Sequence, residues 1–339
     1  MKNCETKDNH FVPEQYFQNF VFNDSTLYML NLDKKEIKPI FSFEQICKQR
    51  SLYAIYSKIT NDDIEFCLNL FKINFEDFTF FLTEIANLVN NNIFDNAKQN
   101  SVSRNQEFLY TDIENLFFEN ICENIINKEV VPIYKNNYNI APHHYIISEV
   151  IARIHSRFNK TSIYTQNAKL KEYLKVEYYD TIYYLMSQYF RTKKIISNLK
   201  NTLTKTAKEH GYNENLDNII YLSIIILPIY YMDIMLSLNY HLVLIKNNTN
   251  INFLTSDNPS INTFNNVFKI NSKNYNLEVY FPISSNLAIL FTNKKEFESI
   301  NHIVVNDIEE INKYNTCIIR NAEKYIYSNN NQQLEKYIN

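Results

Sequence analysis

YHLVLI, at residues 240–245, is the point where the hydrophobic pattern of this 339-residue chain changes. From about residue 42 up to Tyr240, apolar residues recur at helical spacing, which predicts a series of helices. Beyond Tyr240 the apolar residues form short continuous runs between turn-like stretches, a pattern typical of strands. We predict four strands in this part of the chain, at residues 241–245, 252–255, 277–282 and 287–292. The first two flank an Asn-rich turn and therefore predict a β-hairpin.

Two further segments complete the predicted fold. Residues 26–30 and 38–41 predict an N-terminal hairpin around a turn at residues 31–35, and residues 307–327 predict a closing helix. We therefore expect an α+β fold, with a mostly helical body and a small antiparallel sheet from the C-terminal third. The N-terminal hairpin could extend that sheet. The tail at residues 329–339 is polar, and we expect it to be frayed.

The helical part contains one unusually apolar segment. Helices are predicted at residues 64–71, 78–89, 111–127, 143–158 and 181–203. Gly211, the single glycine, can end the helix before it in a left-handed cap. The apolar run at residues 218–232 is shorter than the roughly 20 residues that a membrane span needs. Because it contains Pro228, we predict a buried helix that the proline kinks or ends, and no membrane segment.

The composition excludes several classes of protein. The formal net charge is -3, so there is no overall basic field to attract nucleic acid. A single glycine rules out Gly-rich phosphate loops, and neither HExxH nor GxSxG occurs. Five cysteines lie far apart, which favours buried thiols over disulfides or a cysteine zinc site. The start of the chain, MKNCETKDNH, lacks the apolar core of a secretion signal, so we expect a cytoplasmic protein.

The remaining motifs follow one another in a characteristic order. They are NHFVP at residues 9–13, Tyr16, Phe20, FLTSDNP at 253–259, FPIS at 281–284, Asn315, Ala322 and YIYS at 325–328. This order resembles the domain-of-unknown-function family 4238 from end to end. The resemblance implies a prokaryotic protein often encoded near phage-defence and mobile genes, without an established chemistry. It also implies a single domain over residues 1–328, in which residues 54–108 are a helical insertion.

The resemblance implies further site residues in the middle of the chain. The acidic helix of the family falls on Glu114, with Glu119 or Glu123 behind it, and its arginine falls on Arg157 or Arg191. A carboxylate on a helix could share a metal with a second carboxylate, or pair with the arginine. The alternative is an internal carboxylate–arginine pair that holds the core together.

His10 and Asp257 are the polar motif residues with the clearest chemical uses. His10 could act as a general base or metal ligand, or it could bond a backbone carbonyl and fasten the N-terminal segment. Asp257 follows a predicted strand and precedes Pro259, where it could bind a metal or transfer a proton. Ser256 and Asn258 would be its hydrogen-bonding partners. The alternative is an Asx-turn, in which the side chain caps its own backbone.

We expect these residues to form one polar cleft. The expected catalytic residues are His10, Asp257, Glu114 and Arg157, and the expected substrate-binding residues are Ser256, Asn258, Tyr16 and Arg191. His10 and Asp257 are also the candidate ligands of a divalent metal. A basic stretch follows, consisting of Lys193, Lys194, Lys200, Lys205 and Lys208. It could contact nucleic-acid phosphates, or it could be a solvated helix face.

Two functions follow as hypotheses. The first is a hydrolytic effector, most plausibly a nuclease acting in phage defence or as a toxin, with nucleic acid or a nucleotide as its partner. The second is a non-catalytic sensor or protein-interaction module whose motifs lock the fold. Burial discriminates between the two. Motif residues open to a cleft favour the enzyme, whereas the same residues sealed and bonded internally favour the module.

Overall fold

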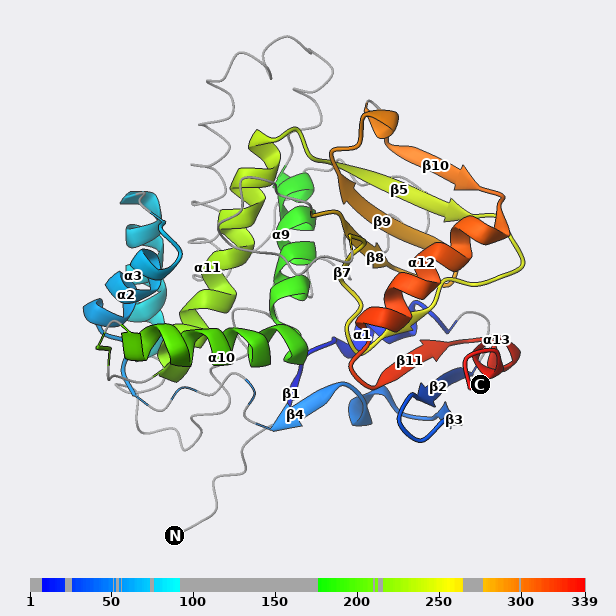
Figure 1. Cartoon of the computed structure of the whole chain (residues 1–339), viewed down its shortest axis with the longest axis horizontal. Helices are drawn as coiled ribbons and strands as arrows, with labels where there is room; N and C mark the ends of the chain where they lie inside the picture. Colours follow the sequence, from blue (N-terminus) through cyan, green and yellow to red (C-terminus); the bar gives the residue numbers. More distant parts are fainter. Residues whose placement is uncertain are drawn as a thin grey trace. The chain divides into compact units, whose positions relative to one another are not determined.

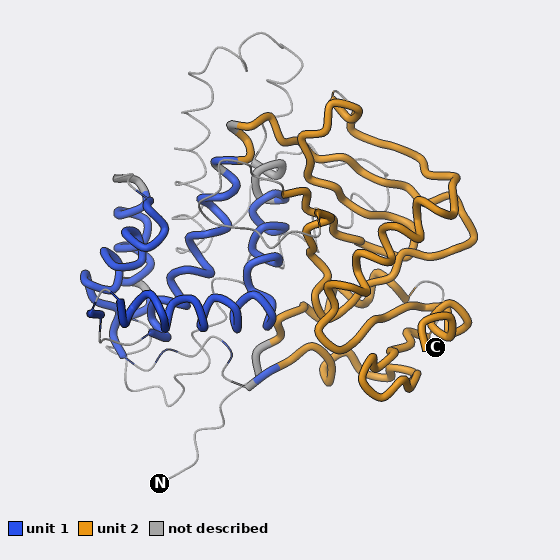
Figure 2. The backbone as a smooth tube through the Cα atoms, in the orientation of Figure 1, with its two compact units in different colours: residues 1–9, 49–116, 133–234 blue, residues 10–48, 117–132, 235–339 orange. Residues whose placement is uncertain are grey.

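The computed structural model describes residues 8–21, 26–50, 52, 55, 57–73, 76–91, 176–209, 211–212, 216–264, 277–298 and 300–338. The chain divides into two compact units, each assembled from separate stretches of sequence (Figure 2). Unit 1 comprises residues 1–9, 49–116 and 133–234, and unit 2 comprises residues 10–48, 117–132 and 235–339. Glu114, Arg157 and the helices predicted at residues 111–127 and 143–158 lie outside the described residues.

The described part of unit 1 is mainly helical (Figure 1). Its helices are α2 (Asn61–Leu70), α3 (Glu76–Asn90), α9 (Val176–Phe190), α10 (Lys193–Glu209) and α11 (Leu216–Ser237), the last of which ends in unit 2. The helices predicted at residues 64–71 and 78–89 are confirmed as α2 and α3. The single helix predicted at residues 181–203 is instead two, α9 and α10, because the chain turns at residues 191–192.

Local capping interactions fix the start of α2 and the end of α10. Thr60 and Asp63 form a capping box at the start of α2, each side chain accepting the other's backbone N–H. Asp63 also accepts from Asn218 Nδ2 at 3.0 Å and from the Tyr212 hydroxyl. Gly211, with φ of 67°, ends α10 in the predicted left-handed cap, after which Tyr212 N donates back to the last turn of α10. The buried Asp63 carboxylate therefore ties α2 to the α10–α11 connection.

Helix α11 contains the apolar run that was expected to be buried. It continues through Pro228 to Ser237, so the proline does not end it. By length and composition α11 could cross a membrane, but most of its side chains are buried inside the protein. Phe190 of α9, for example, stacks on Tyr231 with ring centroids 5.3 Å apart. The prediction of a buried core helix is confirmed.

Unit 2 contains a five-stranded sheet in the order β10-β5-β9-β8-β7. Its strands are β5 (His241–Asn247), β7 (Ile261–Asn262), β8 (Val279–Pro282), β9 (Leu287–Thr292) and β10 (His302–Val305). Strand β10 runs parallel to β5, and the other neighbours are antiparallel. Every residue of β8 and β9 is buried. Strands covered on both faces read as continuous apolar runs, which is why the sequence indicated them clearly.

A second sheet combines strands from the N-terminal region and from the C-terminal third of the chain. It has four strands in the order β3-β2-β11-β6, all antiparallel. They are β2 (Leu27–Asn31), β3 (Glu36–Ile40), β6 (Thr255–Ser256) and β11 (Tyr325–Ser328). The predicted N-terminal hairpin is confirmed as β2 and β3. Strands β1 (Asp8–His10) and β4 (Lys48–Arg50) form a separate two-stranded pair.

Three helices of unit 2 hold these sheets in place. Helix α12 (Ile308–Asn321) begins at Asp307, whose side chain accepts from Glu309 N. Ile311 and Ile318, two turns apart on α12, lie in a core that includes residues of both sheets. Helix α1 (Glu14–Gln18) follows β1. Helix α13 (Asn331–Glu335) occupies the tail that was expected to be frayed, and its Leu334 is buried in the same core.

The prediction of a small antiparallel sheet is wrong. The described residues form two larger sheets, of five and four strands, and one of them contains a parallel pair. The expectation failed because β2, β3, β6 and β11 come from opposite ends of the chain. Pairing between segments so far apart in sequence leaves no trace in a local hydrophobic pattern.

Two local predictions in unit 2 are also wrong. Residues 241–245 and 252–255 do not form a hairpin, because β5 pairs with β9 and β10 whereas β6 pairs with β11 in the other sheet. The closing helix ends at Asn321 rather than at residue 327, and residues 325–328 form strand β11. The aromatic and β-branched residues of YIYS favour a strand, and this preference prevails once a partner strand is available.

Candidate functional site

Most described family motifs meet in unit 2, at a group of buried side chains that we call the motif cluster. Its members are Tyr16, Thr255, Ser256, Asp257 and Asn258, each at most 5% exposed. Tyr16 lies on α1, Thr255 and Ser256 form β6, and Asp257 and Asn258 begin the turn after β6. This cluster brings together most of the predicted site residues that fall in unit 2.

Asp257 binds a run of backbone donors rather than another side chain. Its Oδ1 accepts from Glu323 N at 2.8 Å, and its Oδ2 accepts from Lys324 N at 2.8 Å and Tyr325 N at 3.0 Å. Asp257 N in turn donates to Tyr325 O at 3.1 Å. These donors belong to the link between α12 and β11. The carboxylate therefore holds the chain at the point where it passes from helix to strand.

Opposing influences act on the protonation of Asp257. Burial raises the pKa of its carboxyl group to about 6, while the backbone N–H groups of Glu323, Lys324 and Tyr325 act to lower it. Consecutive backbone N–H groups form a concave site that suits a carboxylate. Both carboxylate oxygens are engaged by this link, so the arrangement is that of a structural clamp.

Ser256 and Asn258 complete the turn after β6. Ser256 Oγ accepts from Asn258 N at 3.0 Å and donates to Asn258 O at 2.9 Å, which closes a local hydroxyl turn. Asn258 Nδ2 donates to Asn321 O at 3.1 Å, at the last residue of α12. Asn258 Oδ1 has no hydrogen-bond partner among the described residues. The turn expected at this position is present, but Ser256 caps it while Asp257 reaches a distant segment.

Tyr16 joins three of the family motifs. Its hydroxyl donates to Pro282 O at 2.7 Å and lies 2.6 Å from Thr255 Oγ1. Because the single phenolic proton is directed at Pro282 O, the Thr255 hydroxyl is the donor in the second bond. The Tyr16 ring packs against Phe281 and Phe20, with centroids 5.0 and 5.2 Å away. The segments HFVP-Y, TSDNP and FPIS are thus tied together by one buried tyrosine.

His10 differs from the motif cluster because it is only half-buried. Its Nε2 lies 3.3 Å from Glu14 Oε1 and 3.4 Å from the Glu44 backbone oxygen. The Glu44 contact matches the expected alternative, in which the ring bonds a carbonyl to fasten the N-terminal segment. Glu14 lies one turn further on, in α1, so the pair also secures the junction between β1 and α1.

Of the remaining predicted site residues, only Arg191 lies within the described part of the chain. Glu114 and Arg157 lie outside the described residues, so their proposed roles stay predictions. Arg191 belongs to unit 1, where it is 3% exposed in the turn between α9 and α10. Among the described residues, no group of three His, Cys, Asp or Glu side chains is arranged to hold a metal ion. A metal site built on His10 and Asp257 also stays a prediction.

Three cysteines fall within the described residues, and all three are free thiols. Burial raises the pKa of the Cys67 thiol to about 12 and the pKa of the Cys47 thiol well above its usual range. Cys47 Sγ lies 3.3 Å from the Tyr327 hydroxyl on β11. Thiols held in the neutral form are poor nucleophiles, so Cys47 and Cys67 agree with the expectation of inert buried cysteines, whereas Cys317 is only half-buried.

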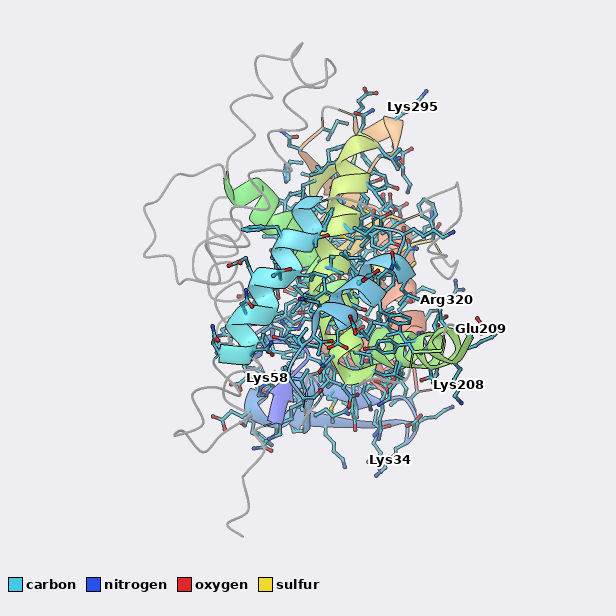
Figure 3. The ribbon with its side chains drawn as sticks, turned by 90° about the vertical axis from the view of Figure 1, so that its left-hand side faces the viewer. Lys34, Lys58, Lys208, Glu209, Lys295 and Arg320 are labelled. Atoms are coloured by element: carbon cyan, nitrogen blue, oxygen red, sulfur yellow. The ribbon has the colours of Figure 1, made fainter. Side chains whose placement is uncertain are left out.

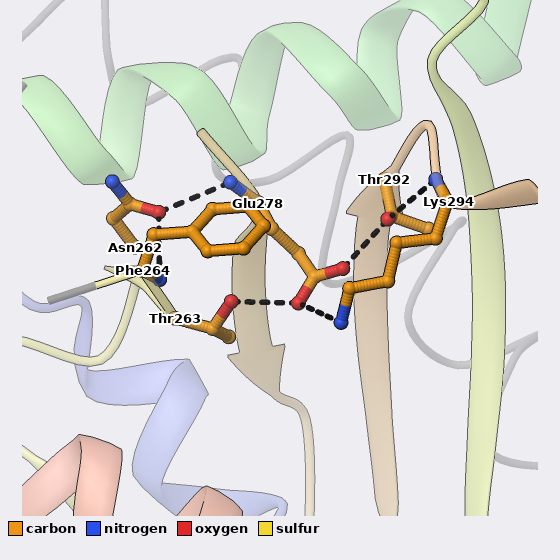
Figure 4. Close-up of polar contacts among 6 residues, drawn as sticks. All are labelled: Asn262, Thr263, Phe264, Glu278, Thr292 and Lys294. Carbon is orange, nitrogen blue, oxygen red and sulfur yellow. Dashed lines mark hydrogen bonds and ion pairs between the residues drawn. The ribbon is translucent and has the colours of Figure 1, made fainter. Parts of the chain in front are cut away.

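Unit 2 contains a second buried carboxylate that was not predicted from the sequence, Glu278 beside β8 (Figure 4). Glu278 Oε1 accepts from Thr263 Oγ1 at 2.6 Å and from Lys294 Nζ at 3.0 Å, and Oε2 accepts from Thr292 Oγ1 at 2.6 Å. Glu278 N donates to Asn262 Oδ1 at 3.0 Å. We call these residues, together with Phe264 under Lys294, the Glu278 cluster. The sequence signal was a single acidic residue inside the apolar run LEVYFP at residues 277–282.

The contacts of the Glu278 cluster also hold parts of the fold together. The Glu278 side chain is 3% exposed, whereas Lys294 is 41% exposed and reaches water. The carboxylate bonds residues at the ends of β7 and β9, which flank β8 in the sheet. A buried carboxylate with three donors is satisfied, so the cluster fixes the ends of three strands.

Comparison with known proteins adds a family but no chemistry. The family model described as "Protein of unknown function (DUF4238)" matches residues 8–332. A search of curated proteins and a search of solved structures each gave no match. The matched range covers most of both units and every motif that meets in the motif cluster. The chain belongs to the DUF4238 family of proteins of unknown function.

Proposed function

We propose that the chain is a non-catalytic protein-interaction or sensor module whose family motifs maintain the fold of unit 2. One observation carries this proposal: Asp257, Ser256, Asn258 and Tyr16 are sealed from solvent and bonded mainly to backbone groups. A catalytic group must be within reach of its substrate, which the burial of these side chains opposes. Burial with internal bonding was the outcome expected of structural motifs.

The bonds of the motif cluster suit a role in holding distant segments together. Tyr16 fastens α1 to β6 and β8, Asp257 fastens the α12–β11 link, and Asn258 fastens the end of α12. None of these junctions is stabilised by local sequence alone, because the partners are more than sixty residues apart. A family can therefore share these motifs through a shared fold, without sharing a reaction.

The alternative of a hydrolytic effector, including a nuclease in phage defence or a toxin, stays a prediction. Its proposed residues Glu114 and Arg157 lie outside the described residues, and of the two described members, half-buried His10 is more accessible to solvent than Asp257. A cytoplasmic location and contact with nucleic acid or a nucleotide remain proposals of the same kind. The buried core position of α11 supports a protein that works outside the membrane.

The test uses variants that separate chemistry from folding. We would express wild type, His10→Gln, Tyr16→Phe and Asp257→Asn in a bacterial host, and measure growth, phage plating and the amount of soluble folded protein. The purified chains would be incubated with RNA, single- and double-stranded DNA, ATP and GTP, with Mg²⁺ or Mn²⁺. His10→Gln is the control, because it removes the candidate base at a half-buried position where little stability is expected to be lost.

Under the proposal, no substrate in this panel is turned over. Any phenotype of Tyr16→Phe and Asp257→Asn then follows the fraction of folded protein, and His10→Gln behaves as wild type. Turnover that His10→Gln abolishes while the folded fraction stays unchanged would overturn the proposal in favour of the hydrolase.

A further inference from the structure

Strand β10 is an edge of the five-stranded sheet, and one side of its backbone faces away from β5. Leu244 N donates to Asn301 O at 2.8 Å, and Asn248 N donates to Val305 O at 2.9 Å. In a parallel ladder the bonding residues alternate along the strand, so residues 301, 303 and 305 face β5. His302 and Val304 therefore direct their backbone N–H and C=O groups outward, where no described strand pairs with them.

The same segment carries exposed apolar side chains. Ile300, Val304 and Ile308 are 37%, 48% and 42% exposed, and they fall within residues 300–308. Large apolar side chains this exposed are few among the described residues. Val304 belongs to β10, while Ile300 precedes the strand and Ile308 begins α12. Exposed apolar side chains gathered in and beside an edge strand are a recognised mark of an interaction surface.

The edge of the other sheet shows how this protein blocks a strand edge. Edge strand β3 contains Pro39, which has no N–H, and Lys38 pairs with Glu36 at 3.1 Å. Lys34, in the turn before β3, projects outward from the ribbon (Figure 3). Charges and proline on an edge strand prevent pairing with another chain. Strand β10, of sequence HIVV, carries neither a proline nor an acidic or basic residue other than His302.

The charge around β10 identifies the chemistry of a partner. Five acidic residues occur in residues 296–310, namely Glu296, Glu298, Asp307, Glu309 and Glu310. They outnumber the nearby lysines, which are Lys246, opposite Val304 on β5, and Lys294 and Lys295, which precede the segment. All five acids are exposed or half-buried. A cationic partner is favoured at such a surface, whereas a second copy of this chain would place two acidic edges together.

We propose that the outer edge of β10 binds an extended segment of another protein, in which apolar and basic residues alternate. The segment adds as a strand next to β10, its backbone bonding His302 and Val304. Its apolar side chains cover Ile300, Val304 and Ile308, and its basic side chains meet the surrounding acids. This inference rests on the proposed function as an interaction module and names the surface that the module uses.

The experiment uses the full chain and a defined probe. The probe is a fluorescent peptide of alternating Val and Lys, compared with a peptide of alternating Val and Glu and with the Val–Lys peptide N-methylated at every second residue. Binding is measured by anisotropy, and hydrogen exchange is followed at His302 and Val304. Val304→Pro removes one outward N–H without breaking a bond to β5, and such an edge position tolerates proline.

Two further variants keep the test informative. Val304→Lys retains the backbone N–H and replaces the apolar contact with a repelling charge, and it can be used if Val304→Pro does not fold. Phe41→Lys is the matched control, because Phe41 is a 90% exposed apolar residue next to the other edge strand, β3. Thermal unfolding of each variant verifies the fold.

We expect the Val–Lys peptide to bind at least about tenfold more tightly than the Val–Glu peptide, with slower exchange at His302 and Val304. Val304→Pro and N-methylation each remove most of the binding, and Phe41→Lys leaves it unchanged. Equal binding by wild type and Val304→Pro overturns the proposal, as does the absence of binding. Self-association that Val304→Pro abolishes also overturns it, because the occupant is then a second copy. None of these failures produces turnover, so each is distinct from a failure of the proposed function.

Discussion

Asp257 and Glu278 are two buried carboxylates of unit 2 that are held in different ways. Asp257 binds backbone N–H groups of three consecutive residues, whereas Glu278 binds two threonine hydroxyls and a lysine. Hydroxyls can rotate toward another acceptor, and the half-exposed Lys294 can turn to water. Backbone donors in a helix-to-strand link cannot move without moving the chain. The comparison indicates that the motif residue Asp257 is the less replaceable of the two for folding.

The largest effect is expected for Asp257→Asn. The amide replaces one acceptor oxygen with a donor, which leaves one or more of the N–H groups of residues 323–325 buried without a partner. We expect a loss on the order of 3 kcal/mol in the free energy of unfolding. Urea unfolding followed by circular dichroism measures it. A loss below that of Glu278→Gln would reverse the comparison.

Wild type and Asp257→Asn also test the protonation of Asp257. Its folded pKa, about 6, lies above the ordinary value of about 4 in the unfolded chain. Folding is therefore favoured by the protonated form, a contribution fully present below pH 4 and lost as the pH rises toward 6. We expect the stability advantage of wild type over Asp257→Asn to shrink between pH 4 and 6. An advantage that instead grows over this range would show that the N–H donors outweigh burial and lower the pKa.

A pair of tyrosines extends the comparison to neutral groups. Tyr16 and Tyr280 are both fully buried, but the Tyr16 hydroxyl has two partners and the Tyr280 hydroxyl has none among the described residues. Tyr16→Phe leaves Pro282 O and Thr255 Oγ1 short of a partner, and we expect it to cost about 2 kcal/mol. Tyr280→Phe removes an unpaired hydroxyl and is expected to leave the melting temperature unchanged or raised. Equal losses in calorimetry would mean that Tyr280 bonds a group outside the described residues.

A smaller loss than for Asp257→Asn or Tyr16→Phe is expected for Glu278→Gln. The amide oxygen still accepts from one hydroxyl, and Lys294 keeps access to water, so a loss of about 1 kcal/mol is expected. Lys294→Met serves as the companion variant, since it leaves Glu278 buried without its cation. If Glu278→Gln alone abolished folding, the side-chain donors would be as rigid as the backbone donors of Asp257.

The motif residues show which features of the candidate site could be predicted from the sequence. Tyr16 and the motif TSDNP identified positions that meet in space, because Tyr16 bonds Thr255. The roles of these motif residues could not be predicted from the sequence, because burial and the identity of a hydrogen-bonding partner depend on distant chain segments. Asp257 was expected to cap its own turn or to face a cleft, and it instead binds the α12–β11 link. Glu278 was not predicted as a site residue because a single acidic residue in an apolar run forms no recognisable motif.

The sequence by itself determined the local elements of this protein: helices α2 and α3, the β2–β3 hairpin, the buried strands β8 and β9, and the Gly211 cap. These depend on side-chain periodicity, turn residues and backbone sterics, which act over a few residues. Only the tertiary structure decided which strands share a sheet, where α12 ends, and that Asp257 is sealed. The physical reason is that strand pairing and burial depend on contacts between segments far apart in the chain. A local sequence pattern does not identify the distant partner of a segment.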